Sequence, residues 1–248
     1  MIKIENVNVY GWEPAIRGMR NPMNSWEKSD SCECSLGEME YSKCLTSCTE
    51  SEIPEKCINC KGVYLGKNDL KLMQSLSKAG TDHSKFLRMI VVTMDITAPL
   101  YWWKEFDTYK VGTVTNSCST MHKIHEKRFE REDFSIEHIE NCAYPKCELN
   151  PNGETHWMVC MDNVIASLNV ARELFLQTGD KKYWWQMIQL LPSSYNQKRT
   201  VQLNYQVLKN MYWARRNHKL DCWHTFCEEI ERLLYFKEIC IEPMEGDK

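Results

Sequence analysis

The chain has 248 residues and a formal net charge of −3 at pH 7, with 43% hydrophobic and 26% charged residues. This length suits one large domain or two small ones, and the composition is that of a soluble globular protein. The charge gives no basic excess that would point to nucleic acid, and no apolar run approaches the roughly 20 residues that a membrane helix needs. The N-terminus lacks the features of a signal peptide, so we expect a cytoplasmic protein.

The N-terminal half predicts two strands and three helices. The strands are Ile2 to Tyr10 and Phe86 to Ile96, which are rich in β-branched and alternating apolar residues. The helices are Glu13 to Arg20, a helix capped by Asn68 or Asp69 that runs to Lys78, and Leu100 to Phe106 after Pro99. Residues 26 to 62 are rich in Cys, Ser, Glu and Lys, and they predict an inserted loop or small module.

The C-terminal half predicts a series of helices. Val159, Asn163, Ala166, Val170 and Leu174 recur near helical spacing and predict a helix over Trp157 to Gln177. Further helices are expected over Ser135 to Ile139, Lys181 to Leu190, Thr200 to Arg216 and Leu220 to Phe236, with a loop over Asn141 to Gly153. The sum is an α+β protein, mostly helical, divided into residues 1–25, 26–62 and 63–248, of which the first packs on the last.

The last quarter of the chain carries the strongest functional signal. The turn Pro192-Ser193-Ser194 leads into a helical pattern whose inner face carries Asn204, Asn210 and Arg215 among apolar neighbours. Polar side chains that share a helix with a buried stripe need partners, and a bound anion is one candidate. The alternatives are core or solvated amides for Asn204 and Asn210, and a surface charge pair for Arg215 and Arg216.

Three stretches, roughly within Lys67 to Met121 and Trp157 to Phe236, form a combined pattern. The first is Gly80 to Arg88, which includes His83 and Ser84. The second runs from Ala98-Pro99 to Thr115-Asn116-Ser117-Cys118-Ser119. The third joins Leu190-Leu191-Pro192 to Asn204, Asn210, Arg215 and Trp223. In this combination the chain resembles the flavin-dependent thymidylate synthases.

The resemblance implies a fold that is mostly helical around a small antiparallel sheet. It also implies an enzyme that methylates dUMP to dTMP with methylenetetrahydrofolate, reduced FAD and NADPH. That reaction needs no enzymic nucleophile, because the protein positions the reactants and stabilises charge. The family is homotetrameric, and the nine Trp and eleven Tyr residues fit an oligomer.

Residue by residue, the resemblance assigns two groups of site residues. The nucleotide group is Ser117, Cys118, Ser119 and Arg215, with Ser119 at the signature serine as the candidate catalytic residue. Arg216 is the alternative to Arg215, because the turn before Trp223 has an extra residue. The first three members of this group would form a loop that cradles a phosphate through backbone N–H groups. The flavin group is His83, Ser84, Lys110, Asn116, Asn204 and Asn210. Ser119 can alternatively cap a helix that begins at Thr120.

The chain departs from the family pattern at three places. Where the family has Arg-His-Arg, this chain has Tyr109-Lys110-Val111, or Thr108-Tyr109-Lys110 if one residue is inserted. In addition, Leu87 and Arg88 replace Glu-His, and Ile188 replaces an Arg. Lys does not replace a bidentate Arg. Two other functions therefore stay open. One is a non-catalytic nucleotide-binding protein on the same fold, and the other is a relative that modifies another pyrimidine nucleotide in a pocket reshaped by Trp102-Trp103 and Tyr109.

Cysteines form a second signal, since six of the thirteen lie between Cys32 and Cys60. Their odd total favours thiols or a metal over a disulfide framework. Four thiolates suit tetrahedral zinc, and the candidate ligands are Cys44, Cys48, Cys57 and Cys60. The alternative is a variable loop with free thiols.

Two smaller groups also bear on ligand binding. Cys118, His122 and His125 would share a helix face, as a metal site or as a partly exposed face. The basic cluster Lys209, Arg215, Arg216, His218 and Lys219 would meet a polyphosphate or be solvated. Cys222 and Cys227 are expected in the core.

Overall fold

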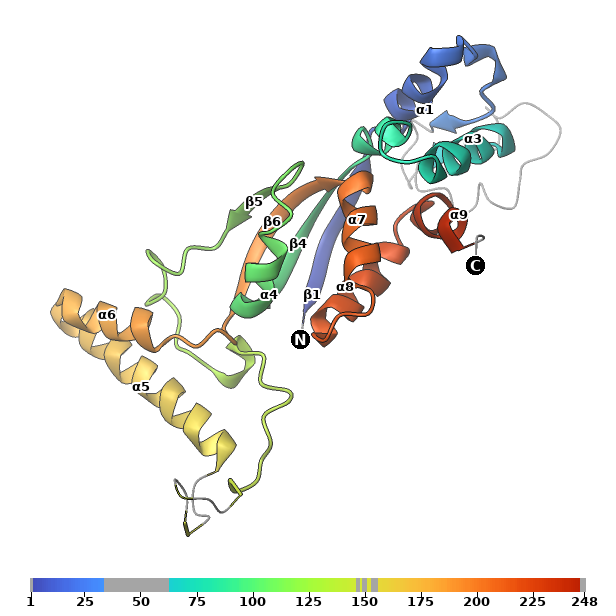
Figure 1. Cartoon of the computed structure of the whole chain (residues 1–248). Coiled ribbons are helices and arrows are strands. Elements are labelled where there is room, and N and C mark those ends of the chain that lie inside the picture. The colour runs from blue at the N-terminus through green and yellow to red at the C-terminus, as the bar shows by residue number, and fades with distance from the viewer. Residues whose placement is uncertain (1, 34–62, 146–147, 149–150, 153–155, 246–248) are drawn as a thin grey trace, which may run out of the picture. The chain divides into compact units, whose positions relative to one another are not determined.

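The computed structural model describes residues 2–33, 63–145, 148, 151–152 and 156–245 (Figure 1). The chain forms two compact units. The first unit consists of Met1–Glu5, Asp95–Thr108 and Thr115–Thr200, and the second unit consists of Asn6–Met94, Tyr109–Val114 and Val201–Lys248. The predicted division into residues 1–25, 26–62 and 63–248 stays a prediction.

A four-stranded antiparallel sheet joins distant parts of the sequence in the strand order β1-β4-β6-β5. Its strands are β1 (Lys3–Tyr10), β4 (Val91–Pro99), β5 (Val114–Ser117) and β6 (Asn196–Asn204). Every second residue of β4 from Val92 to Ala98 is buried, as expected of a strand that turns one face to a core. A small separate sheet pairs β2 (Cys32–Glu33) with β3 (Val63–Tyr64). The predicted fold class is confirmed.

The second unit consists mainly of helices around aromatic side chains. Its helices are α1 (Trp12–Arg20), α3 (Lys67–Lys78), α7 (Tyr205–Arg215), α8 (Asp221–Glu231) and the single turn α9 (Glu242–Glu245). Shorter 3-10 helices cover Asn21–Met23, Trp26–Lys28 and Ser84–Arg88, and Lys237–Ile241 forms a π-helix. The buried ring of Tyr205 meets Trp12 and Phe236 edge to face at 5.6 and 5.2 Å, a favourable arrangement for aromatic quadrupoles.

The first unit contains a helical hairpin in which α5 (Trp157–Thr178) and α6 (Lys181–Leu190) pack side by side (Figure 1). Both helices were predicted. Gly179, at φ +67°, ends α5, and the Asp180 carboxylate accepts the backbone N–H of Lys182 at the start of α6. The unit also holds α4 (Leu100–Phe106) and a 3-10 helix over Arg131–Asp133. The hairpin closes over a core cluster of Ile124, Phe129, Phe134, Met161, Ile165, Leu168, Ala171 and Met187.

Helix α5 is apolar on two sides. One side enters the core cluster, as just described. On the other side Val159 and Val170 are 50% and 58% exposed, and Ala166 is exposed between them. These three residues share one helix side because they are separated by seven and four positions, and we call them the outer face of α5. In the described part of the chain, no helix is long and apolar enough to cross a membrane.

Two predicted helices have different bounds in the structure. The helix predicted from Thr200 begins at Tyr205, because Thr200 to Asn204 complete strand β6. Burial in this part of β6 alternates, with Val201 and Leu203 buried and Gln202 exposed, so its period is two and not 3.6. The helix predicted from Leu220 to Phe236 ends at Glu231, and Tyr235 beyond it has a non-helical φ of +54°.

Three further predictions were wrong. Ser135 to Ile139 is not helical, because the backbone of Ser135 donates to the carbonyl of Ser194 and Phe134 bridges Tyr195. Phe86 to Arg88 belong to a 3-10 helix, so the strand starts at Val91. The segment that follows Ser119 forms turns, so no helix brings Cys118, His122 and His125 onto one face.

A buried ion pair ties α1 to α3 in the second unit. Arg20 and Asp69 are 4% and 0% exposed, and Arg20 Nε donates to Asp69 Oδ1 at 2.7 Å. The same guanidinium donates to the carbonyls of Ser25 and Lys28 at 3.1 and 3.0 Å. This network therefore fixes the chain between α1 and β2 against α3.

The carboxylate of Asp30, not Asn68 or Asp69 as predicted, caps α3. It accepts the backbone N–H groups of Asn68 and Asp69 at 2.9 and 3.0 Å, whereas Gly66 occupies the cap position itself. The two orphan donors of the first turn are thus satisfied by a side chain from a distant part of the sequence.

The environment of Asp69 favours its charged form. Burial alone raises the pKa of Asp69, but hydrogen bonds from Ser31, Ser29, Arg20 and the Asp30 backbone outweigh burial and lower it below its ordinary value. Because the folded pKa is the lower one, the carboxylate stabilises the fold above its unfolded pKa of about 4. That contribution is lost as the pH falls through the folded pKa.

We predict that Arg20→Ala lowers the free energy of unfolding by about 3–5 kcal/mol, because it leaves the buried Asp69 carboxylate without its cation. Arg17→Ala on the same helix is the matched control. It removes an exposed ion pair with Glu13, so the expected loss is below about 1 kcal/mol. Urea denaturation at pH 7 measures both, and equal losses would contradict the prediction.

Candidate functional site

Helix α7 carries two of the predicted site residues, Asn210 and Arg215, and a third, Asn204, caps its start. The helix begins where β6 ends, at Asn204, whose extended backbone and side-chain oxygen make it the N-cap. Asn204 Oδ1 accepts the backbone N–H of Val207 at 3.1 Å, as expected of an Asn at this position. The cap explains why the helix starts here and holds the Asn204 side chain at the first turn.

A chain of hydrogen bonds runs from the 3-10 helix over Ser84–Arg88 to α7. Ser84 Oγ lies 2.7 Å from Gln206 Oε1 and donates to it, while Gln206 Nε2 donates to Asn210 Oδ1 at 3.1 Å. Ser84 and Gln206 are buried, whereas Asn210 is exposed. The structure thus connects Ser84 and Asn210, two residues of the predicted flavin group, through Gln206, which the sequence analysis missed.

Arg215 lies at the last turn of α7 among aromatic rings. Its Nε donates to the hydroxyl of Tyr109 at 2.9 Å. Its guanidinium carbon lies 5.6 Å from the centre of the Tyr109 ring and 5.0 Å from that of Trp223, within cation–π range. Trp223 is fully buried on α8, so it offers a rigid surface.

The turn from Tyr109 to Val114 packs on the start of α7. Gly112 has φ +78°, and a Cβ at this position would lie 3.1 Å from Asn204 Nδ2 and 3.2 Å from Val207 Cγ2. Glycine therefore serves both the left-handed conformation and the close approach. Lys110 of the same turn is exposed. The turn therefore contacts both ends of α7, through Gly112 at Asn204 and through Tyr109 at Arg215.

The predicted basic cluster is divided between the interior and the surface. Lys209 is buried, and its ammonium donates to the carbonyl and hydroxyl of Ser77 at 2.7 and 2.8 Å. Burial lowers its pKa. Arg216 lies 4.2 Å from the centre of the Trp213 ring. The ammonium of Lys209 therefore joins α7 to α3 and does not contact a polyphosphate. Arg215 is the arginine that binds Tyr109.

The predicted phosphate loop, Ser117 to Ser119, lies in the first unit and follows β5. The backbone N–H of Cys118 donates to the carbonyl of Lys198 at 2.9 Å, and its carbonyl accepts Gln197 Nε2 at 2.8 Å. The hydroxyl of Ser119 accepts the N–H of His122 at 3.0 Å, so it closes a turn. Cys118 therefore uses its N–H to hold the loop on β6, and the catalytic role of Ser119 stays a prediction.

The remaining predicted site residues are His83, Asn116 and the four cysteines proposed to bind zinc. His83 and Asn116 are exposed. Cys44, Cys48, Cys57 and Cys60 lie outside the described residues, so the zinc hypothesis stays a prediction. Among the residues that the structure describes, no group of three or more His, Cys, Asp or Glu side chains is arranged to hold a metal. Cys222 and Cys227 are buried, as expected.

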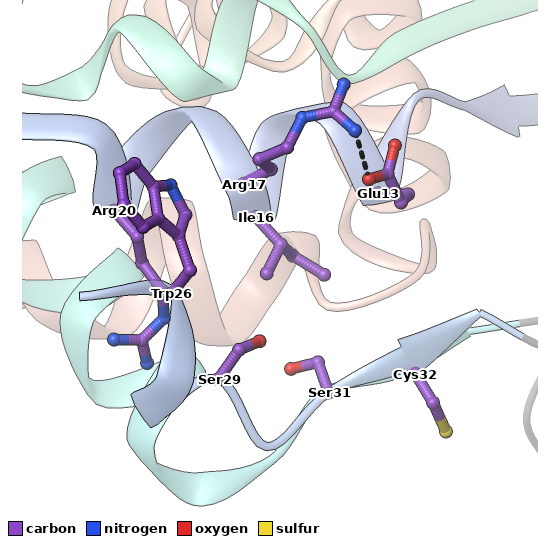
Figure 2. A pocket seen from close by; sticks show the side chains of 8 residues that line it. All are labelled: Glu13, Ile16, Arg17, Arg20, Trp26, Ser29, Ser31 and Cys32. Atoms are coloured by element: carbon purple, nitrogen blue, oxygen red, sulfur yellow. Dashed lines mark hydrogen bonds and ion pairs between the residues drawn. The ribbon is translucent and has the colours of Figure 1, made fainter. Parts of the chain in front are cut away.

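An open cavity of about 280 Å³ lies beside α1 in the second unit (Figure 2). It is lined by Glu13, Ile16, Arg17, Arg20, Trp26, Ser29, Ser31 and Cys32. Its main charged and hydroxyl groups already have protein partners: Arg20 and Ser29 bind Asp69, and Ser31 Oγ accepts the N–H of Gly66. Because its lining contains none of the predicted site residues, we place the candidate site on α7.

The α7 arrangement suits binding and orientation of a ligand. It offers neutral amides at Asn204 and Asn210, the second of which is held by the buried Gln206, and a guanidinium held between rings at Arg215. Such groups fit an anion at one end of the helix and a hydrogen-bonding heterocycle or sugar at the other. Tyr109 could be singled out in the sequence because it breaks the Arg-His-Arg pattern, but its bond to Arg215 could not.

Comparison with known proteins gives a likeness in structure alone. No family model matches the chain, and no curated protein matches it. The crystal structure of a flavin dependent thymidylate synthase from Helicobacter pylori, complexed with FAD and dUMP, matches with a TM-score of 0.58 and 15% identity over 96% of this chain and 98% of that chain. A second crystal structure of thymidylate synthase X from this organism, also with FAD and dUMP, gives a TM-score of 0.59 and 13% identity over 99% and 100% of the chains. At such identities the likeness establishes the fold.

We predict that Gly112→Ala lowers the free energy of unfolding by more than the positive φ alone accounts for, about 2–3 kcal/mol in total. The control is Gly179→Ala, which has φ +67° and whose added Cβ would meet no described atom within 4 Å. The control should lose about 1–2 kcal/mol from the left-handed conformation. Urea denaturation gives the free energy of unfolding of both variants. Identical losses would contradict the close packing of the 109–114 turn on α7.

Proposed function

We propose that this chain is a divergent flavin-dependent thymidylate synthase that methylates dUMP to dTMP with methylenetetrahydrofolate and reduced FAD. The observation that carries the proposal is the arrangement around α7. Ser84 of the first motif stretch connects to Asn210 through Gln206, and Tyr109 of the second stretch binds Arg215 directly. Three stretches that are separate in sequence thus meet on one helix. The shared fold with structures that hold FAD and dUMP supports the same proposal.

Arg215 is proposed to bind the phosphate of the nucleotide. A guanidinium forms charge-assisted hydrogen bonds with phosphate oxygens, and these are about twice as strong as neutral ones. The rings of Tyr109 and Trp223 hold the cation in one region, so less side-chain freedom is lost on binding. The roles of Ser117, Cys118 and Ser119 at the nucleotide remain predictions from the resemblance.

The amides on α7 are proposed to bind the flavin. Asn210 is exposed, and its orientation is set by the bond from Gln206. Neutral amides and a serine hydroxyl suit the carbonyls, ring nitrogens and hydroxyls of FAD. Bound and reduced, FAD would supply the hydride for the reaction. The protein groups on α7 bind and orient, which agrees with a reaction that needs no enzymic nucleophile.

A non-catalytic nucleotide-binding protein is the second candidate. It is favoured by Tyr109, which places a neutral phenol on Arg215 where the family pattern has a basic residue. A site with less positive charge holds a nucleotide and a dinucleotide cofactor together less well. This candidate keeps dUMP binding and lacks the flavin.

Absorbance and turnover distinguish the two candidates. We expect the purified protein to retain added FAD through gel filtration, with an absorbance band near about 450 nm as for any oxidised flavin. We also expect dTMP when dUMP, methylenetetrahydrofolate and NADPH are supplied. Binding of dUMP without flavin would favour the second candidate, and a protein that binds neither would contradict both.

A variant of Arg215 tests its proposed role in nucleotide binding. Arg215→Ala should weaken dUMP binding by about 1.5–3 kcal/mol, the range for a hydrogen bond to a charged group. Arg232→Ala is the matched control, because Arg232 at the end of α8 pairs with Glu229 at the surface and is not one of the predicted site residues. Calorimetric titration with dUMP measures both variants. An unchanged affinity in Arg215→Ala would sink the assignment.

We also propose that the chain self-associates through the outer face of α5, in line with the homotetramer that the resemblance implies. Val159 and Val170 leave apolar surface in water, and the small side chain of Ala166 between them allows a second helix to approach closely. A second copy of the chain would cover this apolar surface and remove it from water. NADPH and folate remain proposed partners on the strength of the resemblance.

Val170→Glu should dissociate the assembly, because a carboxylate in an apolar interface is not solvated. Gln186→Glu, at an exposed position of α6, makes a similar charge change outside the outer face. Light scattering after gel filtration gives the mass of each variant. A wild-type protein that is monomeric at micromolar concentration would refute self-association.

A further inference from the structure

Tyr109 is placed to control the orientation of Arg215. The phenol oxygen lies 2.9 Å from Arg215 Nε and accepts its hydrogen. The ring of the same tyrosine lies 5.6 Å from the guanidinium carbon. One residue therefore contacts the arginine in two ways, through a directional hydrogen bond and through a less directional cation–π contact.

Trp223 provides a second aromatic contact to the guanidinium of Arg215. Trp223 lies 5.0 Å from it, and the Trp223 ring is fully buried. Phe226 packs edge-on against Trp223 with ring centres 5.6 Å apart, and His218 lies 6.3 Å from it on another side. Trp223 is thus closely packed, and Tyr109 contacts Arg215 from outside the α7–α8 pair.

Tyr109 is itself held by the turn that follows it. The N–H of Thr113 donates to the carbonyl of Lys110 at 3.3 Å, and Gly112 fits against Asn204 and Val207. The Tyr109 and Trp223 rings are 6.2 Å apart and inclined by 66°. The turn, the cap of α7 and the aromatic pair therefore place the phenol oxygen relative to the helix.

We infer that Tyr109 is a positioning residue, which orients Arg215 so that its guanidinium receives the phosphate monoester of a nucleotide. This inference rests on the proposed function. The physical reason is that an arginine side chain has many rotamers, and each hydrogen bond made before binding reduces the freedom lost when the anion arrives. A bond at Nε also sets the plane of the guanidinium, and that plane determines where its terminal N–H groups point.

A packing role is the competing explanation. Tyr109 is half-buried, and its ring would contribute to the core even if its hydroxyl were without consequence. The two roles differ in what they predict for the hydroxyl alone, and in whether the effect requires Arg215.

A double-mutant cycle separates the two roles. The variants are Tyr109→Phe, Arg215→Ala and the combination, and the probes are dUMP and inorganic phosphate in calorimetric titrations. Tyr109→Phe keeps the ring and removes the hydroxyl. Tyr212→Phe is the matched control, because Tyr212 on α7 donates its hydroxyl to Glu231 at 2.9 Å and lies outside the proposed site.

Tyr109→Phe is expected to weaken the binding of both ligands by about 5- to 10-fold, which is less than the loss of a direct hydrogen bond to a charged group, because the charge of Arg215 stays and only its orientation is lost. Arg215→Ala should weaken them by about 10- to 100-fold, and the double variant should be no worse than Arg215→Ala. Tyr212→Phe should leave both affinities unchanged. A merely structural role would make the two losses additive.

Further outcomes distinguish the inference from the proposed function. If the wild-type protein binds dUMP and Arg215→Ala loses it while Tyr109→Phe does not, the positioning role is overturned and the nucleotide site stands. If the wild-type protein binds neither probe, the proposed function fails and the inference fails with it. The exchange rate of the Arg215 Nε proton, followed by nuclear magnetic resonance without ligand, should rise in Tyr109→Phe, and an unchanged rate would also overturn the positioning role.

Discussion

The candidate site depends on one change of backbone conformation, from strand to helix at Asn204. Asn204 is still extended, while its side chain caps the first turn of α7. The next residue keeps a link to the sheet, since the N–H of Tyr205 donates to the carbonyl of Ile90 at 3.0 Å. The buried hydroxyl of Tyr205 donates to Leu234 at 2.6 Å. With the start of the helix fixed in this way, the helical period places Gln206, Asn210 and Arg215.

The polar side chains of α7 have partners within the protein, and this gives the site its order. An unpaired buried amide or cation loses its hydration without compensation, which costs about 1–3 kcal/mol or more. Gln206 meets this requirement with Ser84 and Asn210, and Lys209 meets it with Ser77. Some polar residues of α7, such as Gln206 and Lys209, are therefore buried and bind other protein groups, whereas Asn210 is exposed.

Local patterns predicted those elements whose signal lies within the element itself. Helices α5 and α6 were found because their apolar period and end signals are local. Strand β6 was missed because its period of two runs directly into the period of α7. Strand β5 gave no period at all, since all four of its residues are exposed. The candidate site shows the same division. Arg215 was named from the resemblance, and its role stays a prediction, whereas its hydrogen bond to Tyr109 depends on packing between segments 106 positions apart.

The bond between Tyr109 and Arg215 also restricts how this chain can change over evolutionary time. A single replacement of Tyr109 by arginine, toward the family pattern, would set two cations at hydrogen-bonding distance, and like charges so close repel strongly. Replacement of Arg215 by a residue without a hydrogen-bond donor would remove the partner of the Tyr109 hydroxyl beside the Trp223 ring. Each position therefore restricts what is acceptable at the other, and we expect the family signature to be compatible with this chain only through coordinated substitutions. Such a dependence between two positions is epistasis, and here it follows from one hydrogen bond.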